Sequence, residues 1–304
     1  MLAVIDTGVR DHALGVRMNA PAITLPDGCE QPFQSIDEVV AGLKAIDGKL
    51  PPYDGLGHFN RMYLGVTEGV RDAAQSGLFS DSEFLTRLDV VFANRYLLAV
   101  QAASGLPVAA PHCWSTITER RMSSDVAPMQ FALAGMTSHI CYDLVDSVVR
   151  TVEEFGVEPT AVKADFTRVN DILDQLEPTT RSALVSGHEL DGKAGEVFDA
   201  VGEWGLAAAR SAAFADAELL WDLRKHRHVS DDYEHTLDAA VAFANDCLLV
   251  PAGELKAAHL APVHAFWHGR PTGVHGLNRL RHQPPMADTA ADRADAVSGT
   301  RATR

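Results

Sequence analysis

A histidine and an aspartate four residues apart stand in one of the most apolar stretches of this chain, QFALAGMTSHICYDLVDSVVR, residues 130–150. Side chains four residues apart share one face of a helix, so His139 and Asp143 are predicted to lie together. The first half of the stretch is apolar or small on every side, which indicates that His139 is buried. The pair can form an acid–base set or two ligands of a divalent metal. A solvated face continuing through Asp146 and Arg150, or a structural hydrogen bond, are the alternatives.

A second carboxylate, Asp89, lies in the stretch FLTRLDVVFANRYLLAVQAA, residues 84–103, which has no polar face wide enough to meet solvent. Burying a carboxylate costs roughly several kcal/mol unless the group is paired or binds a metal. We therefore expect Asp89 to be buried and to meet a side chain from another helix. A structural Asp–Arg or Asp–Tyr contact is the alternative. The candidate partners are His139, His58, Arg120 and Arg121.

Together these residues predict a site between helices. We assign His139, Asp143 and Asp89 as catalytic residues. If a metal is bound, the same three are its ligands, and imidazole with carboxylate suits zinc, iron or manganese. The polar and aromatic residues predicted to bind a small-molecule substrate are His58, Asn94, Tyr96, Trp114, Gln130 and Cys141.

Composition and missing motifs exclude several classes of protein. A net charge of -15, from 41 acidic and 26 basic residues, argues against nucleic acid or an anionic membrane as partner. The four cysteines are scattered, which predicts reduced thiols rather than disulfides or a zinc knuckle. No run is apolar enough for a signal peptide or a spanning helix, so a cytoplasmic location is expected. The chain has no GxSxG, P-loop, HExxH or paired ExxH motif, which disfavours nucleotide chemistry, common hydrolase nucleophiles and di-iron carboxylate sites.

Helical periodicity dominates from residue 58 onward and predicts an all-α protein with one multi-helix domain, residues 58–268. Residues 1–57 are rich in proline and glycine and predict an irregular N-terminal arm packed on this domain. Within it, one short amphipathic segment, SIDEVVAGLKAI, opens with a serine and acidic residues suited to a helix start. Residues 269–304 are expected to form an extended segment and a disordered tail, because a polar, aromatic-free segment cannot offset the entropy of ordering. The expected helices are 58–76, 81–104, 111–121, 127–155, 164–175, 178–187, 193–225, 230–248 and 252–267.

Five segments, HFNRMYLGV, LDVVFANRYLLAV, QFALAGMTSHICYDL, DFTRVNDIL and AELLWDLR, together resemble an actinobacterial, all-helical family, domain of unknown function 5995. The resemblance spans roughly residues 50–250 and implies no particular reaction, although members occasionally accompany biosynthetic gene clusters. The family usually has Asn where Thr137 and Cys141 stand and Trp where Phe214 stands, which implies a smaller or less polar pocket in this chain. Position by position, the resemblance marks His58, Asp89, Asn94, Trp114, Gln130, His139, Asp143, Asp165, Asn170 and Trp221.

The function expected from these residues is that of a small-molecule tailoring enzyme of the cyclase, lyase, isomerase or hydrolase type. Its pocket would lie between helices, and His139 is the residue whose loss should impair function most. One alternative is a non-catalytic helical protein that binds an apolar metabolite. Another is a structural protein in which Asp89, Asn94 and His139 form a buried polar network. A homo-oligomer is compatible with each.

Overall fold

Helices account for the regular structure of the residues that this computed structural model describes, 20–75, 82–170, 173 and 205–267, and no strand occurs among them. The all-α prediction is therefore confirmed. One helix runs through residues 159–170. The helix predicted at 178–187, the start of that predicted at 193–225 and the predicted tail lie outside the described residues. The other helices are α1 (Ile36–Asp47), α2 (Gly55–Gln75), α3 (Ser82–Ala103), α4 (His112–Arg120), α5 (Pro128–Ser138), the π-helix η1 (His139–Asp143), α6 (Leu144–Phe155), α9 (Leu206–Leu223), α10 (Arg227–Leu248) and α11 (Ala257–Trp267).

The short amphipathic segment expected in the N-terminal arm forms α1. The Ser35 hydroxyl accepts a hydrogen bond from the Glu38 backbone N–H at 3.2 Å, and Asp37 and Glu38 place acidic groups in the first turn. Both features stabilise a helix N-terminus. As predicted, the arm packs on the helical domain: the Ile23 N–H donates to the Ala103 carbonyl at the end of α3.

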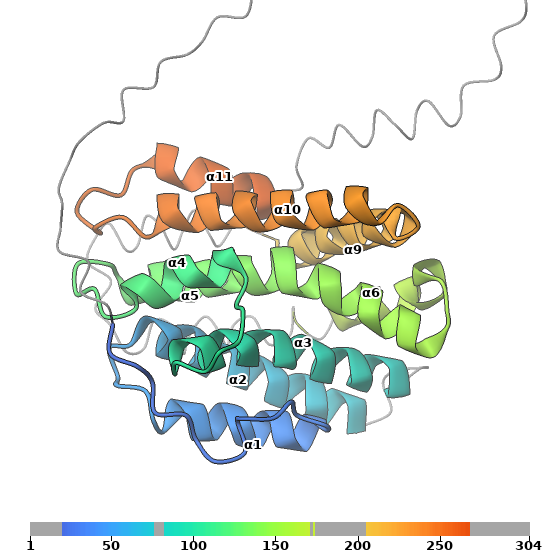
Figure 1. Cartoon of the computed structure of the whole chain (residues 1–304), viewed down its shortest axis with the longest axis horizontal. Helices are drawn as coiled ribbons and strands as arrows, with labels where there is room; N and C mark the ends of the chain where they lie inside the picture. The colour runs from blue at the N-terminus through green and yellow to red at the C-terminus, as the bar shows by residue number, and fades with distance from the viewer. Residues whose placement is uncertain (1–19, 76–81, 171–172, 174–204, 268–304) are drawn as a thin grey trace, which may run out of the picture. The chain divides into compact units, whose positions relative to one another are not determined.

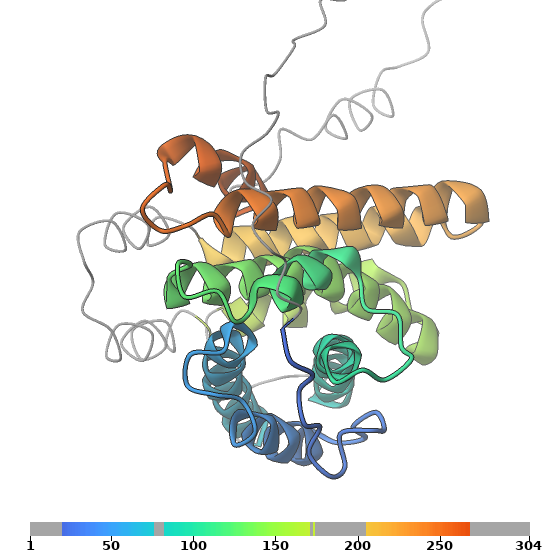
Figure 2. The same ribbon diagram turned by 60° about the vertical axis from the view of Figure 1, so that its left-hand side comes forward.

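The helices lie in three layers (Figures 1 and 2). The first layer holds α1, α2 and α3, the middle layer α4, α5 and α6, and the third α9, α10 and α11. Contacts of α5 with α2 and of α6 with α3 join the first two layers, whereas α4 with α10 and α6 with α9 join the second and third. The continuous helical segment 128–155 is therefore covered on both sides at its centre, where η1 lies.

The start of α4 is fixed by a carboxylate from the third layer. The two oxygens of Asp238 on α10 accept hydrogen bonds from the backbone N–H groups of His112 and Cys113, each at 2.8 Å. A carboxylate at a helix N-terminus satisfies orphan donors and complements the helix dipole. This contact holds Trp114, two residues into α4, over the middle of the protein.

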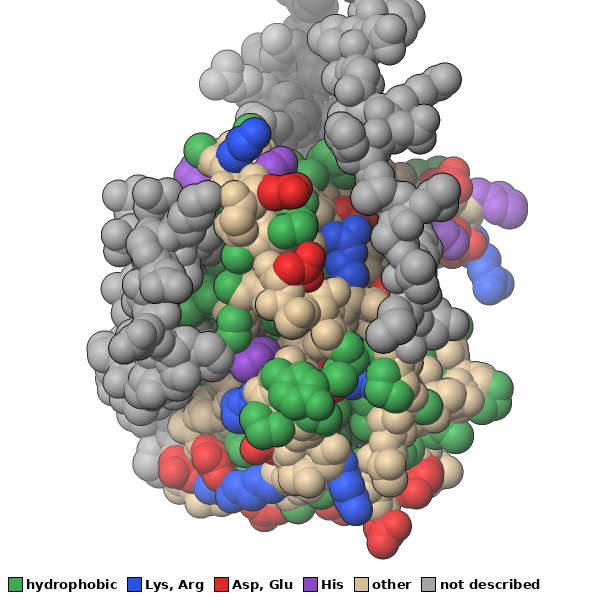
Figure 3. All heavy atoms as spheres, turned by 90° about the vertical axis from the view of Figure 1, so that its left-hand side faces the viewer, with side chains coloured by type: hydrophobic (Ala, Val, Ile, Leu, Met, Phe, Trp, Pro, Cys, Tyr) green, Lys and Arg blue, Asp and Glu red, His purple; other side chains and the backbone are tan. Residues whose placement is uncertain are grey.

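The described residues all fall within one compact unit. On the face shown in Figure 3, acidic and basic side chains are interspersed around a patch of hydrophobic ones, and that face carries no continuous basic surface. None of the described helices is both long and apolar enough to cross a bilayer.

Replacing Gly135 with alanine is expected to destabilise the fold by about 1–3 kcal/mol. A Cβ at this position of α5 would lie 2.5 Å from the Phe59 ring of α2, so the two helices could not keep their present approach. Urea unfolding measures the change. Gly65→Ala is the matched control, because a Cβ there meets nothing within 4 Å and should be neutral or stabilise by up to about 1 kcal/mol. Equal stability of the two variants would contradict the close packing.

Candidate functional site

The helical segment 128–155 changes its winding where the predicted catalytic pair stands. Residues His139–Asp143 form a π-helix between α5 and α6, and the Leu144 N–H donates to the His139 carbonyl five residues earlier. Single π-turns inside α-helices are rare and occur frequently at functional sites. The predicted bounds of this helix, 127–155, are close to those observed, but periodicity gave no sign of the π-turn.

The two side chains of the pair bind each other inside the protein. His139 Nδ1 lies 3.0 Å from Asp143 Oδ2, and the same oxygen accepts a hydrogen bond from Trp114 Nε1 at 2.9 Å. His139 is 2% exposed and Asp143 is fully buried. The alternative of a solvated face is therefore excluded for this pair. A carboxylate only accepts, so Nδ1 carries the proton and Nε2 presents a lone pair.

That lone pair has no partner within the described part of the protein. His139 Nε2 and Asp143 Oδ1 are both buried without a hydrogen bond there, and so is the Tyr96 hydroxyl. Buried polar groups are normally satisfied, and each exception calls for an explanation. Three such atoms around one aromatic cluster indicate a place where a polar group of another molecule, water included, can bind.

Aromatic rings enclose the imidazole of His139. Phe92 of α3 stacks on it with ring centroids 3.5 Å apart and an interplanar angle of 8°. Tyr63 of α2 meets it edge-on at 4.5 Å, and Phe59, Tyr96 and Trp114 complete the enclosure. Burial lowers the pKa of His139, and the hydrogen bond to Asp143 opposes this effect. The imidazole is therefore neutral at neutral pH, as a general base must be.

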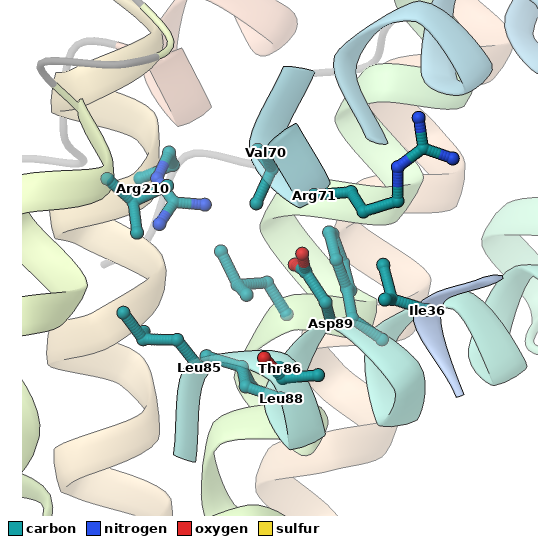
Figure 4. Close-up of a pocket in the computed structure, with 11 residues that line it drawn as sticks. Ile36, Val70, Arg71, Leu85, Thr86, Leu88, Asp89 and Arg210 are labelled. Atoms are coloured by element: carbon teal, nitrogen blue, oxygen red, sulfur yellow. The ribbon is translucent and has the colours of Figure 1, made fainter. Parts of the chain in front are cut away.

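Asp89, the third predicted catalytic residue, lies in a pocket beside this enclosure (Figure 4). Its carboxylate is half-buried and makes no hydrogen bond or ion pair with the described residues. Desolvation raises its pKa to about 6, although Arg210 of α9 opposes this. The prediction that Asp89 is buried against a bonded partner was thus wrong in part, and the charge that faces it comes from none of the four residues expected. The pocket is lined by Ile36, Val70, Arg71, Leu85, Thr86, Leu88, Asp89, Phe92, Leu144, Val169 and Arg210.

Phe92 connects the pocket with the histidine, because it lines the pocket and stacks on His139. Tyr63 also lies close to both His139 and Asp89. Burial, and then the negative charge of Asp89, raise the pKa of Tyr63 well above its usual range. Neither His139 nor Asp143 lines this pocket. The structure therefore brings the three predicted residues into one region but keeps aromatic rings between Asp89 and the His139–Asp143 pair.

This separation corrects the prediction of a three-ligand metal site. Among the described residues, no group of three or more histidine, cysteine, aspartate or glutamate side chains could hold a metal ion. Asp89 is therefore not a third ligand beside His139 and Asp143. Asp143 instead orients the imidazole of His139 through its hydrogen bond, which was the other role expected for this residue.

Two of the predicted substrate-binding residues have their hydrogen-bonding groups used by the backbone. The Asn94 amide pairs with Phe33 of the arm, accepting from its N–H at 2.8 Å and donating to its carbonyl at 2.9 Å. Gln130 Oε1 accepts from the Ala127 N–H, and its Nε2 donates to the carbonyls of Leu248, the last residue of α10, and Val250. Both residues therefore join elements of the fold in this structure.

The remaining predicted residues divide between the enclosure and the surface. Trp114 and Tyr96 belong to the enclosure, with Trp114 hydrogen-bonded to Asp143. Cys141 lies in η1 and is buried. His58, at the start of α2, has its Nδ1 3.2 Å from the Arg61 guanidinium and does not line the Asp89 pocket.

Sequence reasoning missed Tyr63, Phe92 and Arg210. The two aromatic residues resemble ordinary core positions, so their types carry no signal. Arg210 did offer one: it is the single charge in the run LAAARSAAF, and a lone charge among small apolar residues of a helix indicates a buried partner or ligand.

The fold and site define an all-helical protein with a buried histidine–aspartate pair beside a small charged pocket. Residues 36–251 match a family of unknown function, DUF5995, and the chain belongs to this family. Comparison with curated proteins and with solved structures gives no match.

Proposed function

We propose that this protein is a small-molecule enzyme, acting in the cytoplasm and in specialised metabolism, in which His139 is the general base. The observation that carries the proposal is the buried, unpaired Nε2 of His139, whose ring is fixed by Asp143 at the other nitrogen. A base held by an orienting carboxylate is the arrangement that proton-transfer enzymes use. It suits a cyclase, lyase, isomerase or hydrolase reaction.

Each residue of the buried set has a part in such a proton transfer. His139 takes a proton from substrate at Nε2, and Asp143 stabilises the resulting imidazolium through the hydrogen bond to Nδ1. Trp114 donates to the same carboxylate oxygen and so restrains Asp143. Burial lowers the pKa of His139, which keeps the base unprotonated before substrate arrives.

The route to His139 passes Phe92, because this ring lies between the imidazole and the pocket at Asp89. A substrate in the pocket reaches Nε2 when the ring turns or shifts. Side chains commonly change rotamer on binding at protein interfaces whose backbone stays nearly fixed.

Phe92→Ala is expected to expose His139 to reagents in solvent. In the native protein His139 is 2% exposed and should resist acylation by diethyl pyrocarbonate, whereas the variant should react at this position within the same time. Peptide mass spectrometry measures the modification. Phe84→Ala, on the same helix and 1% exposed, is the matched control: both truncations should cost about 3–5 kcal/mol, but only the first opens the enclosure. Equal modification of His139 in both variants would contradict the assigned route.

The test of the function is deuterium exchange. The purified protein is incubated in D2O with a metabolite extract, and mass spectrometry identifies compounds that gain deuterium or change mass. A general base that abstracts a carbon-bound proton, or that promotes ring closure or elimination, leaves such a trace. The native protein should produce it, whereas His139→Asn, which keeps a donor toward Asp143 but lacks Nε2, should not. A trace of equal size from both proteins would remove His139 from the reaction.

A non-catalytic binding protein is the second candidate. It is favoured by the lining of the pocket, seven of whose eleven residues are hydrophobic: Ile36, Val70, Leu85, Leu88, Phe92, Leu144 and Val169. Such a protein would enrich a compound from the extract without changing it. Enrichment with no deuterium incorporation and no mass change would support this candidate.

A further inference from the structure

Two opposite charges face the same pocket without joining. Arg210 comes from α9 and Asp89 from α3, and Figure 4 shows both side chains directed into the pocket. They do not form an ion pair, although each influences the pKa of the other. Partly buried opposite charges normally pair directly, since desolvation is otherwise uncompensated. Asp89 and Arg210 stand on two helices, α3 and α9, that both pack on α6.

Arg210 is held in place and still has a donor free. It is 8% exposed. Its Nε donates to Asn170 Oδ1 at 2.8 Å, Nη2 lies 3.4 Å from the Phe166 carbonyl, and the guanidinium covers the Phe166 ring at 4.4 Å. Nη1 makes no hydrogen bond with the described residues, yet it is not among their fully buried unsatisfied atoms. This nitrogen is therefore accessible from the pocket, where an oxygen acceptor can meet it.

The other cation of the pocket is neutralised from outside. Arg71 of α2 donates to Asp72 through Nε and Nη2, at 3.1 and 2.9 Å, and lies near Asp37. Figure 4 shows its guanidinium turned away from Asp89. Arg210 and Asp89 are thus the two charges that a ligand in the pocket would meet.

We propose that this pocket binds the head group of a free amino acid, with the carboxylate on Arg210 and the ammonium on Asp89. The negative carboxylate of a zwitterion can pair with Arg210 while its positive ammonium pairs with Asp89. Hydrogen bonds between charged groups are stronger than those between neutral groups. The cavity volume of about 30 Å³ is room for only about two or three water-sized groups. Most of the remaining lining is apolar, which favours an aliphatic side chain at the pocket mouth.

This site stands on its own geometry and needs no chemistry at His139. Its test is a binding measurement, calorimetry or ligand-observed NMR, with the full chain and L-leucine, L-valine and glycine as probes. Two analogues separate the contributions: 4-methylpentanoate lacks the amino group of leucine, and 3-methylbutylamine lacks its carboxylate. L-Leucine should bind in the millimolar range or better, and each analogue at least about tenfold more weakly.

Variants locate the binding. Asp89→Asn should weaken leucine about tenfold or more and leave 4-methylpentanoate nearly unchanged, because only the ammonium contact is lost. Arg210→Lys should weaken leucine and 4-methylpentanoate together. Glu83→Gln, exposed on the same helix as Asp89, is the control and should change neither. The proposal is overturned if no probe binds the native protein, if leucine and both analogues bind equally, or if Asp89→Asn, a near-isosteric change, binds leucine as the native protein does.

Discussion

Replacing Arg121 with methionine is expected to destabilise the protein by about 3–5 kcal/mol. The Arg121 side chain is 4% exposed and forms an ion pair with Asp54, which is fully buried. It also donates to the Pro21 carbonyl of the arm. Methionine fills similar volume but leaves the Asp54 carboxylate without its cation, and an unpaired buried charge is far costlier than a lost surface pair. Urea unfolding at neutral pH measures the difference.

The neighbouring arginine is the matched control. Arg120 pairs with Asp246 at the surface, where the two side chains are 40% and 47% exposed, so Arg120→Met should cost about 1 kcal/mol or less. The double variant Asp54→Asn with Arg121→Met should recover part of the loss. Asparagine removes the charge yet can still accept the Leu56 N–H that caps α2. Equal losses from Arg120→Met and Arg121→Met would show that the buried pair contributes no more than a surface one.

Asp89 is expected to make stability depend on pH. Its pKa is raised to about 6 from an ordinary value near 3.8, so the folded state binds this proton more tightly than the unfolded state. The contribution of Asp89 is therefore most favourable below about pH 4 and is lost as pH rises through about 6. Asp89→Asn should stabilise the protein at pH 7 by on the order of 1 kcal/mol and flatten this dependence, whereas Glu83→Gln should not. Urea unfolding across this window measures both effects.

Periodicity predicted the helices well because a helix buried on one face repeats apolar residues at every turn. The segment predicted at 127–155 spans residues 128–155 in the structure, and α4 and α10 also begin and end within a few residues of their predicted bounds. In the arm, prolines and glycines indicated irregular chain, while Ser35, Asp37 and Glu38 indicated the helix start that α1 shows.

The partner of Asp89 could not be predicted, because it depends on which helices pack together. The sequence indicated that a carboxylate in an apolar helix needs a positive group, and an arginine does face it. That arginine, Arg210, lies 121 positions along the chain, on the helix that packs across α6. Its isolation in the run LAAARSAAF indicates a buried partner but does not identify Asp89 as that partner, and the structure uses Arg120 and Arg121 elsewhere.

At His139, contacts within one helix could be predicted from the sequence, whereas contacts between helices could not. The i, i+4 spacing predicted that His139 and Asp143 would meet, and the apolar surroundings predicted burial. Both predictions are confirmed. The third partner, Trp114, comes from α4, and the stacked ring comes from α3. Only tertiary packing decides that these groups converge, and that Nε2 is left without a protein partner.

Replacing His139 with asparagine is expected to lower turnover by about 10²–10⁴-fold while leaving the fold nearly intact. An asparagine amide can place its nitrogen near the position of Nδ1, so the donor to Asp143 survives and only the unpaired Nε2 disappears. His139→Ala removes more: Asp143 loses one of its two hydrogen-bond donors, and a cavity opens beside Phe92. That variant should also lose about 2–5 kcal/mol of stability. Deuterium exchange with the substrate identified in the extract measures turnover, and urea unfolding measures stability.

The pattern across three variants separates a base from a structural network. If His139 is the base, His139→Asn loses turnover but not stability, and Asp143→Asn lowers turnover to a smaller extent because an amide oxygen can still accept from Nδ1–H. If the pair only fixes helix register, His139→Asn changes neither quantity, and Asp143→Asn mainly weakens the fold. His235→Asn, exposed on α10, controls for the loss of a histidine and should match the native protein. Unchanged turnover in His139→Asn would therefore assign the buried pair to the fold, since the one atom that distinguishes the two roles is Nε2.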